Sequence, residues 1–140
     1  LLEGAAEQLS QAAQAKHITL TVEPFHGQAA FDPRWTGEAL CNVVDNAVKY
    51  TPAGGRVTIS AQMLDSFCRV DVADTGPGIP EEEQARVFTR FYRGQQARAQ
   101  EGLGLGLFLT RSILIREGGY VKLSSKPGAG SVFALCLPLE

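Results

Sequence analysis

Four polar residues, Asn42, Asn46, Lys49 and Tyr50, lie on one side of a helix predicted over residues 33–50. At about 100° per residue they fall opposite an apolar face made of Leu40, Val43, Val44, Ala47 and Val48. A carboxamide oxygen suits Mg²⁺, which binds few protein groups together with water and phosphate oxygens. A lysine suits phosphate, and a tyrosine suits a planar ring. The pattern therefore favours a metal and phosphate site, although a single asparagine on a helix usually only faces solvent.

A second motif, Asp74 to Ile79 (DTGPGI), directly follows a predicted strand. Asp74 continues the alternation of Cys68, Val70 and Val72, so its side chain should point inward. A buried carboxylate without a partner is costly, and an exocyclic amine such as that of adenine would be a suitable partner. Gly76 and Gly78 would let the chain turn and let a ring approach the backbone. The alternative is an ordinary turn from strand to helix with a capping aspartate.

A third motif, Gly102 to Leu107 (GLGLGL), leads into an apolar helix. Glycines before a helix N-terminus expose backbone N–H groups that can bind an anion. The spacing matches neither the dinucleotide-binding fingerprint nor the P-loop. The alternative is a flexible hinge, because glycine-rich turns are common.

The elements that must position these motifs alternate between helices and pairs of strands, which predicts an α+β fold. We expect a two-layer α/β sandwich with a mixed, mostly antiparallel sheet of about five strands and about three helices on one face. The predicted helices cover residues 1–16, 33–50, 80–88 and 104–117, and the predicted strands cover 17–23, 56–64, 67–73, 120–126 and 131–137. Residues 94–102 are polar and without a pattern, so a mobile loop is predicted there.

Length and composition limit the class of protein. The 140 residues predict a single domain over residues 1–140, and 44% hydrophobic residues exclude wholesale disorder. A net charge of −2 argues against nucleic-acid binding. Cys41, Cys68 and Cys136 lack a C-x-x-C spacing, so we expect reduced thiols in the cytoplasm. The chain does not begin with Met, which favours a piece of a longer protein.

Taken together, the motifs resemble the ATP-binding catalytic domain of sensor histidine kinases, which has the Bergerat fold shared with gyrase, heat-shock chaperone and MutL ATPases. The resemblance covers nearly the whole chain. It rests on an N box, a first glycine box, an F box, a last glycine box and a closing hairpin, at residues 42–52, 74–80, 87–94, 102–107 and 128–138.

The resemblance assigns roles to single residues. Asn46 would ligate Mg²⁺ with Asn42 beside it, Lys49 would contact phosphate, Tyr50 would pack on the nucleotide, and Asp74 would accept from the adenine amino group. The implied catalytic residues are Asn42, Asn46 and Lys49. The implied nucleotide-binding set also includes Gly76, Gly78, Ile79, Phe88, Phe91, Arg93, Gly102, Leu103, Gly104, Leu105, Gly106 and Leu107.

Residues 94–102 would form an ATP lid that hinges on Gly102, Gly104 and Gly106. Phe88 and Phe91 would anchor this lid, although a role in the hydrophobic core is the simpler alternative. Arg93 would reach phosphate or the partner domain. The family commonly has a hydroxyl residue where this chain has Leu103, which removes one phosphate contact.

The resemblance implies a kinase that binds ATP with Mg²⁺ and transfers the γ-phosphoryl group to a histidine on a separate dimerisation domain of the same protein. A response regulator would be the next partner. We expect this domain to be monomeric and cytoplasmic, and the full-length protein to be a homodimer anchored in the bacterial membrane.

Two alternatives remain. A conformational ATPase of the gyrase or MutL type would carry a glutamate at position 42, and asparagine cannot act as a general base. A nucleotide-binding module without catalysis is the other alternative.

Overall fold

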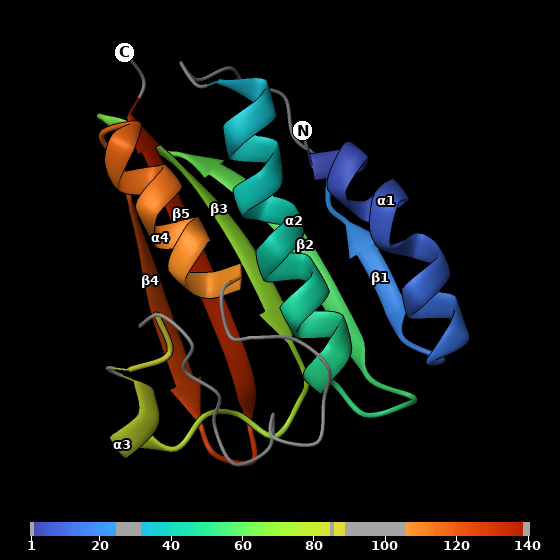
Figure 1. The fold of residues 1–140 in the computed structure, drawn as a ribbon. Coiled ribbons are helices and arrows are strands. Elements are labelled where there is room, and N and C mark those ends of the chain that lie inside the picture. Colours follow the sequence, from blue (N-terminus) through green and yellow to red (C-terminus); the bar gives the residue numbers. More distant parts are fainter. Residues whose placement is uncertain (1, 25–31, 85, 89–105, 139–140) are drawn as a thin grey trace.

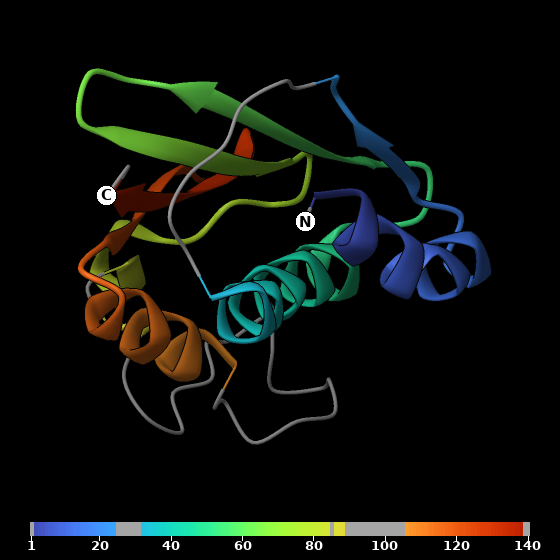
Figure 2. The same ribbon diagram turned by 90° about the horizontal axis from the view of Figure 1, so that it is seen from above.

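The computed structural model describes residues 2–24, 32–84, 86–88 and 106–138. A five-stranded sheet forms one layer, and helices α1, α2 and α4 form a second layer on one face of it (Figures 1 and 2). The helices are α1 (Leu2–Ala15), α2 (Pro33–Tyr50), α3 (Glu81–Gln84) and α4 (Gly106–Arg116). The strands are β1 (Thr19–Val22), β2 (Arg56–Met63), β3 (Phe67–Asp74), β4 (Tyr120–Lys126) and β5 (Gly130–Pro138). The predicted two-layer α+β architecture is confirmed.

The strand order is β1-β2-β3-β5-β4. Strands β1 and β2 are parallel, and the other three neighbouring pairs are antiparallel, so the sheet is mixed as predicted. The central strand β3 pairs on both sides and ends at Asp74, which lies opposite Val57 of β2 and Ser131 of β5. The sheet therefore holds the backbone of Asp74 from both sides.

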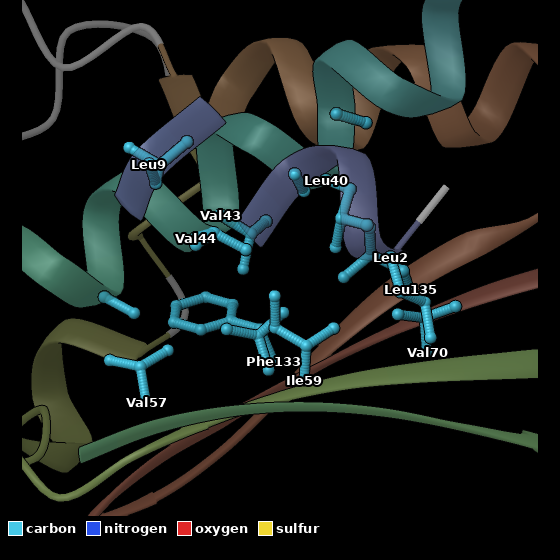
Figure 3. Packing of buried hydrophobic residues seen from close by; sticks show 14 of the residues in the cluster. Leu2, Leu9, Leu40, Val43, Val44, Val57, Ile59, Val70, Phe133 and Leu135 are labelled. Carbon is cyan, nitrogen blue, oxygen red and sulfur yellow. The ribbon is translucent and has the colours of Figure 1, made fainter. Parts of the chain in front are cut away.

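The core lies between the sheet and the helices (Figure 3). Helix α2 buries the apolar face that its periodicity predicts, with Leu40, Val43, Val44, Ala47 and Val48 all nearly inaccessible. Opposite it, the sheet contributes Val57, Ile59, Val72, Phe133 and Leu135. Burial of this apolar area provides the main favourable term in folding and fixes the rotation of α2 about its axis.

Helices α2 and α4 run side by side in opposite directions (Figure 1), and polar contacts join the first half of α2 to α4 and to the residue just past it. Thr110 Oγ1 of α4 donates to the Ala39 carbonyl of α2 at 3.1 Å. The Glu117 carboxylate, just past α4, accepts from the backbone N–H of Asp32 at 3.0 Å and from Thr36 Oγ1 at 2.5 Å. A carboxylate at a helix N-terminus satisfies free N–H groups and complements the helix dipole.

Two elements, the first strand and the third helix, differ clearly from their predicted extents. The first strand begins at Thr19 rather than at residue 17, because His17 has a φ of 62° and forms a corner between α1 and β1. The helix predicted over residues 80–88 comprises only Glu81–Gln84. After Gln84 the chain forms a turn, in which the Arg86 N–H donates to the Glu83 carbonyl at 3.0 Å, and the Gln84 side chain donates to the carbonyls of Ile79 and Ser125.

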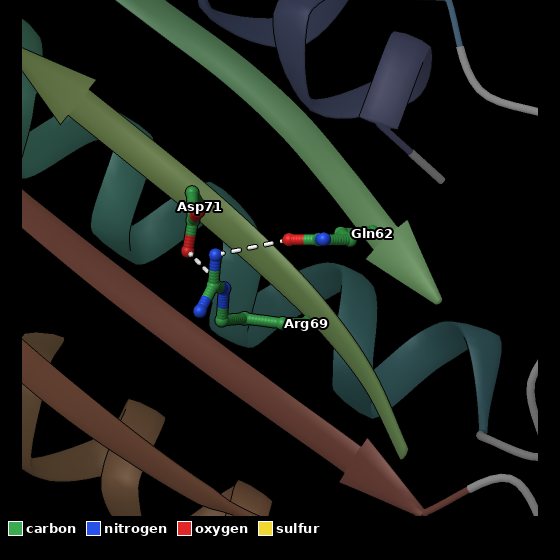
Figure 4. Close-up of polar contacts among 3 residues, drawn as sticks. All are labelled: Gln62, Arg69 and Asp71. Atoms are coloured by element: carbon green, nitrogen blue, oxygen red, sulfur yellow. Dashed lines mark hydrogen bonds and ion pairs between the residues drawn. The ribbon is translucent and has the colours of Figure 1, made fainter. Parts of the chain in front are cut away.

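The sheet face turned away from the helices carries polar side chains (Figure 4). Arg69 Nε lies 3.2 Å from Asp71 Oδ1, and Arg69 Nη2 donates to Gln62 Oε1 at 3.1 Å. Arg69 and Asp71 alternate along β3 with the core residues Cys68, Val70 and Val72, and Gln62 of β2 lies opposite Arg69, so these three polar residues share the face away from the core.

Candidate functional site

Helix α2 places the first set of predicted site residues. Asp32 caps the helix by accepting from the Arg34 backbone N–H at 3.0 Å, and Pro33 occupies its first turn. The apolar face is buried against the sheet, so Asn42, Asn46, Lys49 and Tyr50 lie along the remaining side and are all partly buried. The predicted polar stripe is thus present, and it is more enclosed than an ordinary solvent-facing helix surface.

Asn42 faces the start of α4. A Cβ atom added to Gly106 would lie 3.9 Å from Asn42 Cβ, so the glycine leaves room beside the asparagine. Asn42 Nδ2 is buried and has no hydrogen-bond partner within the described part of the chain. A buried donor without an acceptor is unfavourable, and a phosphate oxygen would supply that acceptor. The arrangement therefore fits a phosphate group between α2 and the first turn of α4.

The donors present also fit a divalent cation that is bound together with phosphate. Among the described residues, no three His, Cys, Asp or Glu side chains gather into a group that could hold a metal ion. Mg²⁺ commonly keeps water and substrate phosphate oxygens as ligands and takes only one or two protein groups. Asn46 lies one turn beyond Asn42, and its carboxamide oxygen would serve as such a ligand.

Lys49 forms an ion pair within its own helix. Its Nζ lies 3.0 Å from Asp45 Oδ2, and the two side chains are 42% and 41% exposed. Pairs of this kind contribute only about 0.3–0.5 kcal/mol. Lys49 can therefore leave Asp45 at little cost when a more highly charged group such as a triphosphate is available.

Asp74 ends β3 and faces the helical layer. Its Oδ1 accepts from the Gly76 backbone N–H at 2.9 Å. Burial raises the pKa of this carboxyl above its ordinary value, and the backbone N–H groups of Gly76 and Ser131 partly oppose the rise. The carboxyl is thus partly desolvated and already oriented, as expected of a group that accepts from a ligand.

The glycine turn after Asp74 packs against the end of α2. A Cβ atom on Gly76 would lie 3.2 Å from the Tyr50 carbonyl oxygen and 3.5 Å from Thr51 Oγ1. Gly76 is buried, so a larger side chain would push the two segments apart. The tertiary structure therefore brings the second motif against the C-terminal end of the first.

The β4–β5 hairpin supports this turn from the other side. The Ile79 N–H donates to Ser125 Oγ at 2.8 Å, and the Gly128 N–H donates to the Pro77 carbonyl at 2.6 Å. Ser125 Oγ also lies 2.9 Å from Ser131 Oγ. The sequence motifs did not predict that Ser125 and Gln84 support this turn. The only sequence signal near Ser125 is the run of small residues at the closing hairpin.

Three other predicted residues, Ile79, Phe88 and Leu107, pack partly buried against the core. The Phe88 ring meets Phe133 edge to face, with centroids 5.9 Å apart. Phe88 therefore has at least a packing role in the hydrophobic core. The remaining predictions fall on Phe91, Arg93, Gly102, Leu103, Gly104, Leu105 and the lid at 94–102, which lie outside the described residues.

The raised pKa of Asp74 predicts a specific pH dependence of stability. The folded chain keeps the proton to a higher pH than the unfolded chain, whose carboxyl titrates near 3.8. The stability that the protonated Asp74 carboxyl contributes to the folded chain is fully present below pH 3.8, and it is lost as the pH rises through the pKa of the folded chain. The unfolding free energy of the wild type minus that of Asp74→Asn should therefore fall as the pH rises over this range. Urea titrations at several pH values measure the difference, and a constant difference would contradict the assignment.

The polar stripe on α2, the aspartate at the end of the central strand and the glycine turn after it lie together in a domain with helices on one face of a mixed sheet. The family of histidine kinase-, DNA gyrase B- and HSP90-like ATPases matches residues 31–140. The chain belongs to this family, and the predicted Bergerat fold is confirmed.

The relatives of this chain include a sensor protein and a signal-transduction histidine kinase. The sensor protein DivL of Caulobacter vibrioides is 41% identical over 140 residues, which are 99% of this chain and 18% of DivL. The histidine-protein kinase/phosphatase MprB of Mycolicibacterium smegmatis is 37% identical over 115 residues, which are 81% of this chain and 23% of MprB. The chain therefore spans about a fifth of the length of these relatives.

Solved histidine kinase structures have the same fold. A mycobacterial MprB structure superposes with a TM-score of 0.85 at 31% identity, covering 98% of this chain and 92% of that one. Full-length ShkA in complex with AMPPNP superposes with a TM-score of 0.86 at 32% identity, covering 98% of this chain and 29% of ShkA. No helix within the described ranges combines the length and the apolar character that a membrane span needs.

Proposed function

We propose that this chain is the ATP-binding catalytic domain of a sensor histidine kinase, and that it transfers the γ-phosphoryl group of ATP to a histidine on a separate dimerisation domain of the same protein. The observation that carries the proposal is the presence on one side of the fold of an oriented Asp74 carboxyl and of a buried Asn42 amide that has no partner among the described residues. One suits the amino group of adenine, and the other suits a phosphate oxygen. The ShkA structure with AMPPNP, a similar fold holding an ATP analogue, supports this assignment.

The residues divide the work between binding and positioning. Asp74 accepts from the adenine amino group, while the close packing of Gly76 on Tyr50 keeps the ring-binding turn in place. Asn42 and Lys49 contact phosphate oxygens, and Asn46 holds Mg²⁺, which neutralises phosphate charge when it is bound. Phosphoryl transfer needs little more from a protein than such positioning and charge stabilisation.

Asn42 favours a kinase over a conformational ATPase. Hydrolysis needs a group that accepts a proton from water, and a carboxamide cannot do so. The Asn42 amide is also buried against the start of α4, where a carboxylate would meet the triphosphate. We therefore propose slow water attack, with the phosphoryl group retained for a histidine and then for a response regulator. In the full-length protein we propose a homodimer anchored in the membrane.

The deciding experiment measures two products of the same reaction. The chain is incubated with Mg²⁺-ATP and a separately made histidine-containing dimerisation domain from a related kinase. Phosphate release should stay near background while the acceptor becomes labelled. Brisk phosphate release without labelling of the acceptor would favour the conformational ATPase, and nucleotide binding without either product would favour a module that lacks catalysis.

Asn46→Ala tests the metal assignment. Loss of the carboxamide should weaken ATP binding in the presence of Mg²⁺ more than in its absence, because only the metal-bound form uses this ligand. Gln62→Ala is the matched control, since it removes a carboxamide from the sheet face away from the helices. Calorimetric Mg²⁺ titrations measure the effect, and identical titrations for Asn46→Ala and the wild type would remove Asn46 from the metal site.

A further inference from the structure

The C-terminal end of α1 makes a polar contact with the end of α2 that carries the proposed nucleotide-binding residues. Lys16 Nζ donates to the Val48 carbonyl at 3.1 Å and also to the Lys49 carbonyl. These carbonyls belong to the last turn of α2, where backbone acceptors have no partner within the helix. A cation at this position also complements the helix dipole. Lys16 thus caps a helix to which it does not belong.

The backbone around Lys16 is held rigidly in place. Helix α1 ends in a Schellman motif, in which the His17 N–H donates to the Gln14 carbonyl and the Ile18 N–H donates to the Ala13 carbonyl. His17 takes the left-handed position of this motif, with a φ of 62°. That conformation costs a non-glycine residue about 1–2 kcal/mol, so it persists only where surrounding contacts support it.

Those supporting contacts come from the turn that follows α2. The Gly54 N–H donates to the His17 carbonyl at 2.9 Å, and the Thr19 N–H donates to the Gly55 carbonyl at 3.0 Å. With the two bonds from Lys16, the corner between α1 and β1 is joined to both the last turn of α2 and the loop beyond it. The corner and the end of α2 therefore have to move together.

The end of α2 and the loop beyond it also contact the turn that follows Asp74. Gly76 lies against the Tyr50 carbonyl and Thr51 Oγ1, and Thr75 Oγ1 accepts from the Arg56 N–H at 2.9 Å. A continuous set of contacts thus runs from Lys16, through residues 48–56, to the turn after Asp74. The steps are the hydrogen bonds of Lys16, the covalent chain of residues 48–56, and the contacts that this stretch makes with Thr75 and Gly76.

We infer that Lys16 is a positioning residue: its ammonium group fixes the end of α2 against the turn after Asp74, so that the placement of α1 sets the affinity for ATP. The inference rests on the proposed function, because it assigns a control to the same nucleotide site. It does not make Lys16 a ligand of the nucleotide, since its ammonium group points at backbone carbonyls. It also makes α1 an element through which a change elsewhere in a longer protein would reach the site.

The test compares Lys16→Met, which keeps the apolar stem and removes the donors, with Lys16→Arg, which restores a cation. We expect Lys16→Met to weaken ATP binding about fivefold or more, within the usual range of coupling between sites, and Lys16→Arg to stay close to the wild type. Glu117→Gln is the matched control, because Glu117 caps the opposite end of α2. It should lower stability without changing ATP affinity.

The second readout is the backbone amide resonance of Gly76 in the chain without nucleotide. Lys16→Met should shift this resonance, whereas Glu117→Gln should leave it in place. Unchanged ATP affinity and an unchanged Gly76 resonance in Lys16→Met would overturn the inference, as would an equal loss of affinity in Glu117→Gln. If Lys16→Met does not fold, Lys16→Leu, which also has no hydrogen-bond donor, takes its place with the same expected outcome. If the wild type itself does not bind ATP, the proposed function fails, and the Gly76 resonance still decides the role of Lys16.

Discussion

Replacing Asp74 with asparagine is expected to weaken ATP binding by about 1–3 kcal/mol, which is about 5- to 150-fold in the dissociation constant. The carboxylate is held at the end of the central strand, with Oδ1 accepting from the Gly76 N–H. An ionised acceptor forms a stronger hydrogen bond with an amine than a neutral carboxamide does. Asparagine keeps the shape of the side chain, so the loss measures the charged contact rather than the packing.

The control for this substitution is Asp71→Asn on the same strand. Asp71 lies three residues earlier and pairs with Arg69 on the sheet face away from the helices (Figure 4). Calorimetry with ATP on the three proteins should show a loss for Asp74→Asn and none for Asp71→Asn. Wild-type affinity in Asp74→Asn would exclude Asp74 from the adenine contact, and it would leave the Asn42 evidence for phosphate untouched.

Replacing Gly78 with alanine is expected to destabilise the fold by about 2–5 kcal/mol, in two parts. Gly78 has a φ of +76°, which costs an alanine about 1–2 kcal/mol. The new Cβ would also lie 2.2 Å from the Lys126 carbonyl oxygen, so the turn or the β4–β5 hairpin has to shift. Such overpacking costs about 1–3 kcal/mol more. Because this turn follows Asp74, the residue proposed to contact adenine, ATP affinity should fall as well.

Gly128→Ala separates the two parts of that cost. Gly128 has a φ of +82°, and an added Cβ meets nothing within 4 Å. It should therefore show only the conformational cost and leave ATP binding unchanged. Unfolding in urea measures both variants, and equal destabilisation by the two would show that the close approach of Gly78 to Lys126 has no energetic consequence.

The sequence by itself determined the helices and strands with strong hydrophobic patterns. The apolar face of α2 is readable because helix periodicity places Leu40, Val44 and Val48 together wherever the helix is buried. The alternation along β3 likewise separates Val70 and Val72 from Arg69 and Asp71. The glycine and asparagine motifs indicated the family, because their spacing along the chain reflects the local geometry of turns and helix faces.

Local patterns could not predict contacts between residues distant in sequence. The parallel pairing of β1 with β2 depends on how α1 and α2 pack, and it leaves no mark in either strand. Ser125 and Gln84 support the glycine turn from elsewhere in the chain, and neither residue type is unusual for an exposed hairpin or a short helix.

What the sequence determined about the site was therefore its list of chemical groups, and what only the tertiary structure decided was their arrangement. Asn42 is an ordinary helix residue in sequence, and in the part of the chain that the structure describes it is a buried donor without a partner, beside Gly106 of α4. Lys16 carries no motif, and it reaches the end of α2 because the corner at His17 turns α1 back toward it. For Asn42 the decisive free energy is the desolvation of its amide, and for Lys16 it is the capping of a helix end. Both arise only when distant segments pack together.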